Sequence, residues 1–187
     1  MKKTLLILIL IVSCYAVLAQ ESKWPDSLNI TLPTKDGNIY YEQIVNVDSV
    51  DKNQLFNAAR IWFSNTFKSA KSVLDLDDRN TGRLIGNGNL TYSTSLQKVY
   101  GERRASFKID ITLKDGKYRV IISDIEDIST GGYGDLNKYN YENLHPEVKQ
   151  KFKEKFKYAT LSAFDMSVKI LIASLNKAIM ETTKDSF

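Results

Sequence analysis

The sequence predicts an α+β domain of two layers, in which helices cover one face of an antiparallel sheet. Three observations predict it: a capped amphipathic helix follows an early strand, four strand-like runs come next, and a long apolar helix follows them. The expected order is therefore strand, helix, four strands, helix. A chain of 187 residues with 43% hydrophobic residues is large enough to bury a core of its own.

The chain divides into an export signal at residues 1–19, an extended lead-in at 20–38 and one domain at 39–183. Pro25, Pro33 and Asp36-Gly37 punctuate the lead-in, which has room for a short strand at 28–32. Residues 39–47 are rich in β-branched and aromatic side chains and predict the first strand of the domain.

The first helix has a clear start signal and is predicted over residues 52–70. Asp51 is a suitable N-cap, and Gln54 completes a capping box with it. Val50 and Leu55 are placed for a hydrophobic staple. The buried face follows from apolar residues at helical spacing: Leu55, Ala59, Trp62, Phe63, Phe67 and Ala70.

Strands are predicted at 73–76 and 83–93, with a turn at 77–82 and a polar connection at 94–103. Asp115-Gly116 predicts a two-residue type I′ hairpin. That hairpin pairs Leu113 with Tyr118, Ile111 with Val120 and Ile109 with Ile122, all on one apolar face. The opposite face is polar apart from Ile121 and includes Lys108, Asp110, Thr112, Arg119 and Ser123. We therefore expect helices on the apolar face only.

The last helix is predicted over residues 146–182, with Pro146 in its first turn. Two apolar stripes follow it, one of which includes Met166 and Ile170, so the helix should be well covered. Unbroken, it would span about 55 Å at 1.5 Å per residue. That length exceeds a small domain, and we expect a bend or break near residues 157–162.

Several segments together resemble the family of the domain of unknown function numbered 4468, DUF4468. They are Leu55 to Phe63, Thr66 to Lys71, Thr81 to Gly88, and the hairpin Lys114 to Tyr118, all within residues 37–125. The resemblance implies a TBP-like fold, with a curved antiparallel sheet, in exported envelope proteins of Gram-negative bacteria. It implies no activity, and DNA binding does not follow from the fold.

The first 19 residues have the pattern of a bacterial export signal. Lys2 and Lys3 precede an apolar run, and Val17-Leu18-Ala19 is a small-residue cleavage site before polar residues. We therefore expect an exported protein, either free in the periplasm or associated with the outer membrane. An uncleaved anchor is the minor alternative.

A competing signal surrounds Cys14. Ile11-Val12-Ser13-Cys14 resembles a lipobox, which would make Cys14 a lipidation site and the first mature residue. The residues after Cys14 are apolar, whereas a lipoprotein usually becomes polar there, so soluble release is favoured. The lipidated form remains the alternative, as a membrane-tethered structural protein.

Composition excludes several classes of site. Cys14 is the single cysteine and His145 the single histidine, so a His/Cys zinc site is excluded from the mature chain. Without Lys2 and Lys3 the formal charge falls from +4 to +2, which does not favour nucleic acid. The acidic run Asp75, Asp77, Asp78 fails the EF-hand pattern and indicates a solvated turn. We predict no cofactor, no metal and no catalytic residues.

The most favoured function is a non-enzymatic binding or accessory module for a protein, lipid or glycan of the envelope. Its candidate contact residues are Tyr133, Tyr139 and Tyr141 in a Gly/Tyr/Asn-rich loop, with Lys108 and Arg119 on the open sheet face. The enzymatic alternative is a hydrolase or isomerase that uses carboxylates and tyrosines such as Asp75, Asp110 and Tyr133. The partner and the oligomeric state are left open.

Overall fold

The computed structural model describes residues 28, 30–67, 73–96, 99–129, 134–135 and 149–184. The predicted order of strand, helix, four strands and helix is confirmed, with short strands added at the margins. The elements are β1 (Thr34–Lys35), β2 (Asn38–Ile39), β3 (Tyr41–Asn46), α2 (Lys52–Phe67), β4 (Leu74–Asp78), β5 (Arg83–Leu96), β6 (Val99–Lys114), β7 (Lys117–Asp127), β8 (Gly134–Asp135) and α4 (Gln150–Lys184).

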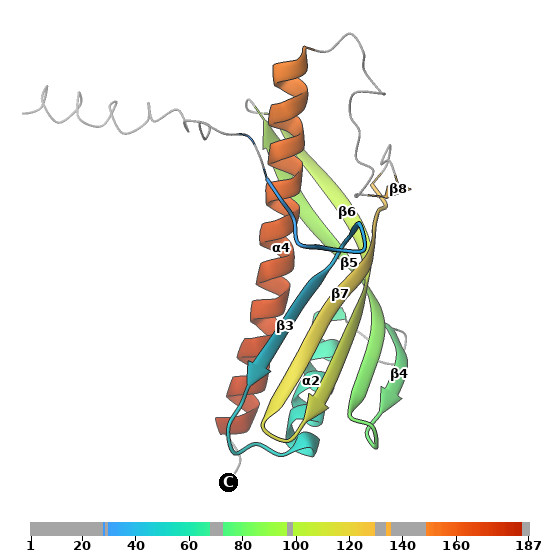
Figure 1. Cartoon of the computed structure of the whole chain (residues 1–187), viewed down its shortest axis with the longest axis vertical. Helices are drawn as coiled ribbons and strands as arrows, with labels where there is room; N and C mark the ends of the chain where they lie inside the picture. The colour runs from blue at the N-terminus through green and yellow to red at the C-terminus, as the bar shows by residue number, and fades with distance from the viewer. Residues whose placement is uncertain are drawn as a thin grey trace, which may run out of the picture.

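One antiparallel sheet forms the first layer of the molecule. Its strands follow the order β3-β7-β6-β5-β4, and β8 pairs with β7, while β1 and β2 form a separate small hairpin. Helices α2 and α4 pack against each other and against the same face of the sheet, so the α+β two-layer prediction is confirmed (Figure 1). The other face of the sheet has no helix from the described part of the chain (Figure 1).

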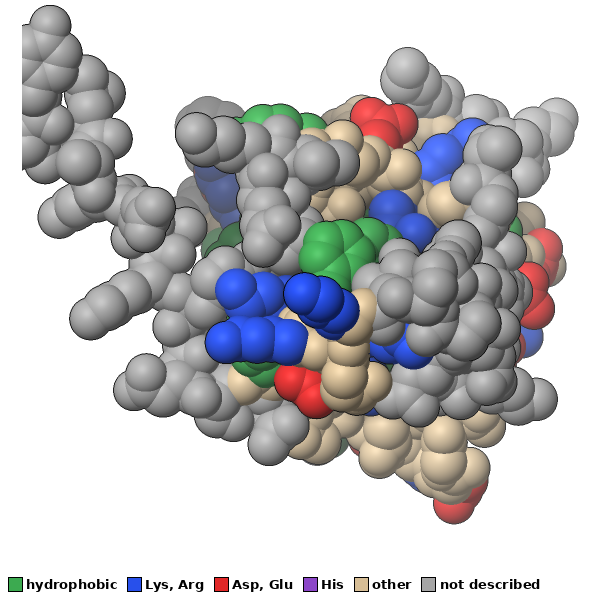
Figure 2. Space-filling model, turned by 90° about the horizontal axis from the view of Figure 1, so that it is seen from above, with side chains coloured by type: hydrophobic (Ala, Val, Ile, Leu, Met, Phe, Trp, Pro, Cys, Tyr) green, Lys and Arg blue, Asp and Glu red, His purple; other side chains and the backbone are tan. Residues whose placement is uncertain are grey.

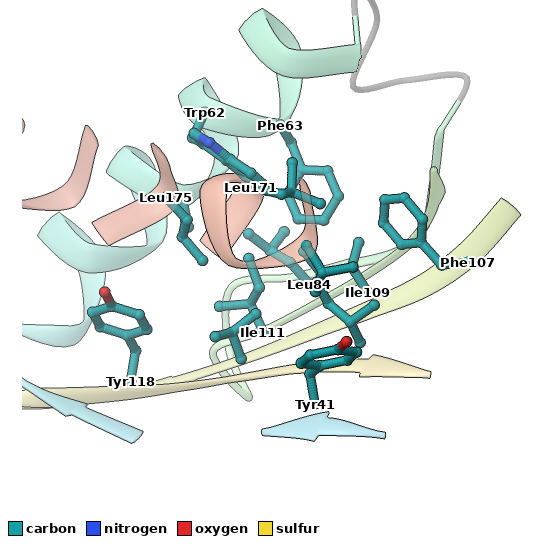
Figure 3. Packing of buried hydrophobic residues seen from close by; sticks show 14 of the residues in the cluster. Tyr41, Trp62, Phe63, Leu84, Phe107, Ile109, Ile111, Tyr118, Leu171 and Leu175 are labelled. Atoms are coloured by element: carbon teal, nitrogen blue, oxygen red, sulfur yellow. The ribbon is translucent and has the colours of Figure 1, made fainter. Parts of the chain in front are cut away.

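The core lies between the sheet and the two helices. Leu84, Ile109 and Ile111 point from the strands toward Phe63 of α2 and Leu175 of α4 (Figure 3). These five side chains are at most 1% exposed. The strands alternate because successive residues point to opposite faces, and this alternation produces the one-sided apolar sheet.

The predicted start of α2 is confirmed in detail. Asp51 Oδ1 accepts hydrogen bonds from the N–H groups of Asn53 (2.7 Å) and Gln54 (3.1 Å), and Gln54 Oε1 accepts one from the Asp51 N–H. Asp115 of the β6–β7 turn accepts a further bond from the Lys52 N–H at 2.7 Å. The hairpin therefore anchors the start of α2 as well as the two strands that it joins.

Three expectations about the strands and their connections are wrong. Residues 94–103 are not a polar connection, because β5 and β6 continue as a long hairpin whose register runs from Arg83↔Thr112 to Leu96↔Val99. The three cross-strand pairs of the β6–β7 hairpin are confirmed. Its turn is not type I′, since only Gly116 has a positive φ (72°) and type I′ needs one at both positions. The short strand expected at 28–32 is absent from residues 30–32.

Helix α4 has no break at residues 157–162, contrary to the expectation. It is one α-helix of 35 residues, about 52 Å long at 1.5 Å per residue. The long β5–β6 hairpin supports its first half, so the domain is long enough to accommodate it (Figure 1). Although α4 is long and apolar enough to cross a membrane by composition, Phe164, Val168 and Leu175 are fully buried in the core.

A smaller part of the surface of α4 is buried than the sequence predicted. Met166 is 64% exposed and Ile170 is 62% exposed, so this part of the first stripe faces away from the core. At the start of α4, Lys149, Lys151 and Lys157 are exposed, whereas Lys153 is buried. Figure 2 looks at the end of the molecule where α4 begins, and Lys and Arg side chains gather there beside a hydrophobic side chain.

Candidate binding edge

Two of the predicted contact residues lie where the sequence placed them, on the open face of the sheet. Lys108 Nζ is 3.9 Å from Asp124 Oδ2, and Arg119 Nη1 is 3.6 Å from Glu42 Oε1. All four side chains are at least 39% exposed, so these ion pairs contribute little stability. Tyr133, Tyr139, Tyr141 and Cys14 lie outside the described residues.

The two described carboxylates of the enzymatic alternative have separate hydrogen-bond partners. Asp75 Oδ2 accepts a hydrogen bond from Asn87 Nδ2 at 2.6 Å. Asp110 accepts two from Arg83, at 2.6 and 3.2 Å. Among the residues that the structure describes, no group of three or more His, Cys, Asp or Glu side chains could hold a metal ion.

Strand β3 is an edge of the sheet, and its outward amides have no strand beside them in the described part of the chain. Among the described strands, β3 pairs with β7 alone. The Val47 N–H donates to the Gly116 carbonyl at 2.8 Å, so Val45/Tyr118, Gln43/Val120 and Tyr41/Ile122 are the hydrogen-bonded pairs of the register. The N–H and C=O groups of Glu42, Ile44 and Asn46 therefore point away from the sheet.

The surface is hollowed on both sides of this edge. On the helix side, a groove of about 400 Å³ lies between β3 and α4, lined by Pro33, Tyr41, Glu42, Gln43, Lys169, Ile172, Ala173 and Asn176. On the open face, a hollow of about 270 Å³ is lined by Ile44, Thr112, Lys114, Lys117, Tyr118 and Arg119. Because side chains of a strand alternate between faces, a strand added to β3 would direct every second side chain toward the helix-side groove, whereas the open-face hollow lies inward of Ile44, over β7 and β6.

The helix-side groove has a nearly neutral floor. The Tyr41 hydroxyl donates to Asp165 Oδ1 at 3.0 Å, and Lys169 Nζ is 2.7 Å from Asp165 Oδ2. Burial, followed by the charge of Asp165, raises the pKa of Tyr41 well above its usual value, so the phenol stays protonated. Asn176 donates to Gln43 at 3.2 Å. The polar groups of the floor are thus already paired, and Ile172 and Ala173 provide apolar surface.

The two edges of the sheet are protected very differently. β4, at the far edge, has three aspartates in five residues and a register irregularity between Leu74 and Leu76. Charges and bulges are the usual means of preventing an edge strand from pairing with another chain. β3 has a continuous register, and Ile44 at its centre is 64% exposed. The pairing-competent edge is therefore β3.

The sequence predicts this strand but does not indicate that it lies at an edge of the sheet. The pattern of residues 39–47 predicts a strand without indicating whether a neighbour lies on each side. One signal was present: Glu42, Ile44 and Asn46 alternate with Tyr41, Gln43, Val45 and Val47, which places an isoleucine on the polar face. An apolar residue at a solvent-facing strand position is the feature that could have identified the edge.

The comparisons with known proteins agree with this fold. The family model described as "Domain of unknown function (DUF4468) with TBP-like fold" matches residues 41–127. No curated protein matches the chain by sequence. The matched segment begins at β3 and ends at the last residue of β7, so it contains α2 and the whole main path of the sheet.

Two solved structures share the architecture. A TBP-like protein from Parabacteroides distasonis has a TM-score of 0.62 at 19% identity, over 79% of this chain and 96% of that one. A DUF4468 family protein from Bacteroides ovatus has a TM-score of 0.57 at 14% identity, over 77% of this chain and 89% of that one. At these identities the likeness concerns the fold alone. The resemblance drawn from the sequence is confirmed: the chain has a TBP-like fold, and its residues 41–127 match the DUF4468 family.

Proposed function

We propose that this protein is an exported, non-enzymatic binding module that pairs along β3 with an extended segment of a protein. The observation that carries the proposal is the contrast between a protected β4 edge and an unprotected β3 edge. In strand addition, main-chain hydrogen bonds supply affinity and alternating side-chain pockets supply specificity. The outward amides of Glu42, Ile44 and Asn46 offer such main-chain hydrogen bonds, and the groove between β3 and α4 offers a pocket for alternate side chains.

A protein segment suits this site better than a lipid or a glycan. The outward N–H and C=O groups of β3 form a row of alternating donors and acceptors, which another peptide backbone matches along its length. An acyl chain would leave these groups unsatisfied, at a cost for each buried polar group. The export signal at residues 1–19 adds the expectation that the partner lies in the cell envelope.

Site-specific photo-crosslinking in the native envelope tests the proposal. A photoreactive phenylalanine analogue replaces Ile44 in one variant and Ile61 in the control. Ile61 lies on α2 and is 52% exposed, so it matches Ile44 in chemistry and approximate exposure but not in position. We expect position 44 to crosslink to one defined protein segment and position 61 not to do so. Equal labelling from both positions, or none from position 44, would contradict the proposal.

A further inference from the structure

We infer that the segment paired with β3 is β3 of a second copy of this chain, which makes the protein a homodimer through its sheet edge. This inference rests on the proposed function, because it names the occupant of the same edge. The register, the side chains and the charges of β3 and β7 support it.

The backbone pattern of β3 is self-complementary about Ile44. Two antiparallel copies can hydrogen-bond only if the outward residues of one face the outward residues of the other. Centring the two-fold axis on Ile44 pairs Ile44 with Ile44 and Glu42 with Asn46. All three outward residues of each copy then lie in hydrogen-bonded pairs, each exchanging an N–H···O=C bond in both directions. If the register between the two β3 strands shifted by one residue, residues whose N–H and C=O groups point toward β7 would lie opposite residues whose groups point outward. These pairs could not form hydrogen bonds.

The side chains at the centre favour the same register. Ile44 is 64% exposed and is the exposed large apolar residue of the strand. On the axis it would contact its own copy across the new strand pair, as β-branched residues do in sheets. In a C2 interface the same surface patch of both copies comes together. An exposed residue on the two-fold axis is therefore buried against the same residue of the second copy.

The charges beside β3 are complementary under this pairing. Lys114 and Lys117 are directly opposite each other in the β6–β7 register, and like charges in this arrangement are unfavourable. Neither makes an ion pair with another residue that the structure describes. Asn46 is the β3 neighbour of Lys117. Glu42 of the second copy, opposite Asn46, would lie about 10 Å from Lys117 between Cα atoms. Its carboxylate, which also pairs with Arg119 of its own chain, would add negative charge near these two lysines.

The interface is small, since each copy contributes one strand of six residues. We therefore expect a weak dimer, with a dissociation constant on the order of 10 µM or weaker. Analytical ultracentrifugation across a concentration series should show a reversible monomer–dimer equilibrium. Ile44→Lys should abolish the dimer, because two like charges would face each other on the axis. Ile61→Lys, the matched control on α2, should leave it unchanged.

Disulfide trapping tests the register itself. Cys14 is the single cysteine, so a Cys14→Ser chain provides a background without thiols. Cα atoms of a hydrogen-bonded antiparallel pair are about 5.5 Å apart, which suits a disulfide. Ile44→Cys should therefore crosslink two copies. Glu42→Cys alone should not, because four residues along a strand separate the two thiols by about 13 Å. Combining Glu42→Cys with Asn46→Cys should restore the crosslink.

The outcomes separate this inference from the function on which it rests. Dimers of the wild-type protein, together with the predicted trapping pattern, support self-pairing. A protein that stays monomeric up to roughly 1 mM, where association free energies are already small, overturns the inference. If position 44 still crosslinks to a different protein in the envelope, strand capture stands and only the occupant is wrong. If neither result is obtained, both claims fail.

Discussion

Gly86 and Gly88 allow α2 to pack closely on β5. A Cβ atom at Gly86 would lie 3.1 Å from Phe63 Cε1 and 2.6 Å from the Val73 carbonyl oxygen. At Gly88 it would lie 2.6 Å from Phe107 Cζ and 2.8 Å from Phe67 Cε1. A glycine in a strand often marks such a close approach of the backbone to a neighbouring element.

Gly88→Ala should destabilise the fold by about 1–3 kcal/mol, the usual cost of forcing extra volume into a packed core. The aromatic rings of Phe67 and Phe107 are 6.2 Å apart and must separate to admit the methyl group. The free energy of unfolding from urea denaturation measures the effect. Asn89→Ala is the control. Asn89 follows Gly88 in β5 but points to the open face of the sheet and is exposed. An equal loss in both variants would contradict the packing argument.

Arg103 and Asp127 form a buried ion pair on the helix-facing side of the sheet, with side chains 13% and 1% exposed. Burial acts to raise the pKa of Asp127, but hydrogen bonds from Arg103 and Ser129 outweigh it and hold the pKa below its usual value. The Tyr92 hydroxyl lies beside this pair, and burial, followed by the charge of Asp127, raises its pKa to about 12. Neither residue of the pair was singled out from the sequence.

Asp127→Asn should cost about 3–5 kcal/mol at neutral pH, because it leaves the Arg103 guanidinium buried without its counter-charge. The depressed pKa means that Asp127 stabilises the fold above the ordinary aspartate pKa and loses this contribution as the pH falls through its folded value. The difference in unfolding free energy between wild type and variant should therefore shrink below about pH 4. A difference that is independent of pH would show that the charge of Asp127 is not the cause.

At the scale of elements, the cap of α2 is the best-defined local signal. Asp51→Ala removes the acceptor for the N–H groups of Asn53 and Gln54 and should cost about 1 kcal/mol. Thermal denaturation measures this loss. Asp48→Ala, at an exposed position in the same connection, should have little effect. If the two substitutions had equal effects, the hydrogen bonds of the cap would not be the reason for the loss.

Elements whose caps or turns are encoded by neighbouring residues could be predicted from the sequence. Elements that depend on contacts with residues far away in the sequence could not. The α2 cap and the Asp115-Gly116 hairpin are encoded within a few residues, and both were predicted apart from the turn type. The continuity of α4 was missed because it depends on contacts with β5, which extends further than the sequence predicted as part of its long hairpin with β6. The β5–β6 extension was missed in turn because residues 94–103 are polar, and a hairpin backbone can satisfy its hydrogen bonds without apolar side chains.

The sequence predicted the open-face residues of the candidate site but not the edge position of β3. Lys108 and Arg119 were placed correctly on the open face, since alternation along a strand is a local property. Whether a strand lies at an edge is a property of the sheet order, which no single segment encodes. Ile44 is therefore identified as an edge residue by the sheet order, in which β7 is the one described neighbour of β3. The acidic run of β4 was predicted to be a solvated turn, although Asp75, Asp77 and Asp78 all belong to an edge strand.

For the whole molecule, the two-layer arrangement leaves one surface able to extend the fold. The helices cover one face of the sheet, β4 carries three aspartates at one edge, and several charges of the open face are paired with one another. The β3 edge, with the groove of about 400 Å³ beside α4, is where another strand can add without unpairing a described one. The central claim is that β3 is a docking edge.

Residue-resolved hydrogen exchange of the β3 amides tests this claim most directly. In dilute protein, the amides of Glu42, Ile44 and Asn46 should exchange quickly, whereas those of Gln43 and Val45, bonded to β7, should be protected. At high protein concentration, the three outward amides should become protected from exchange as well. The same protection should follow when the envelope protein identified by photo-crosslinking is added. If they exchange equally quickly under every condition, β3 accepts no strand and the account is wrong.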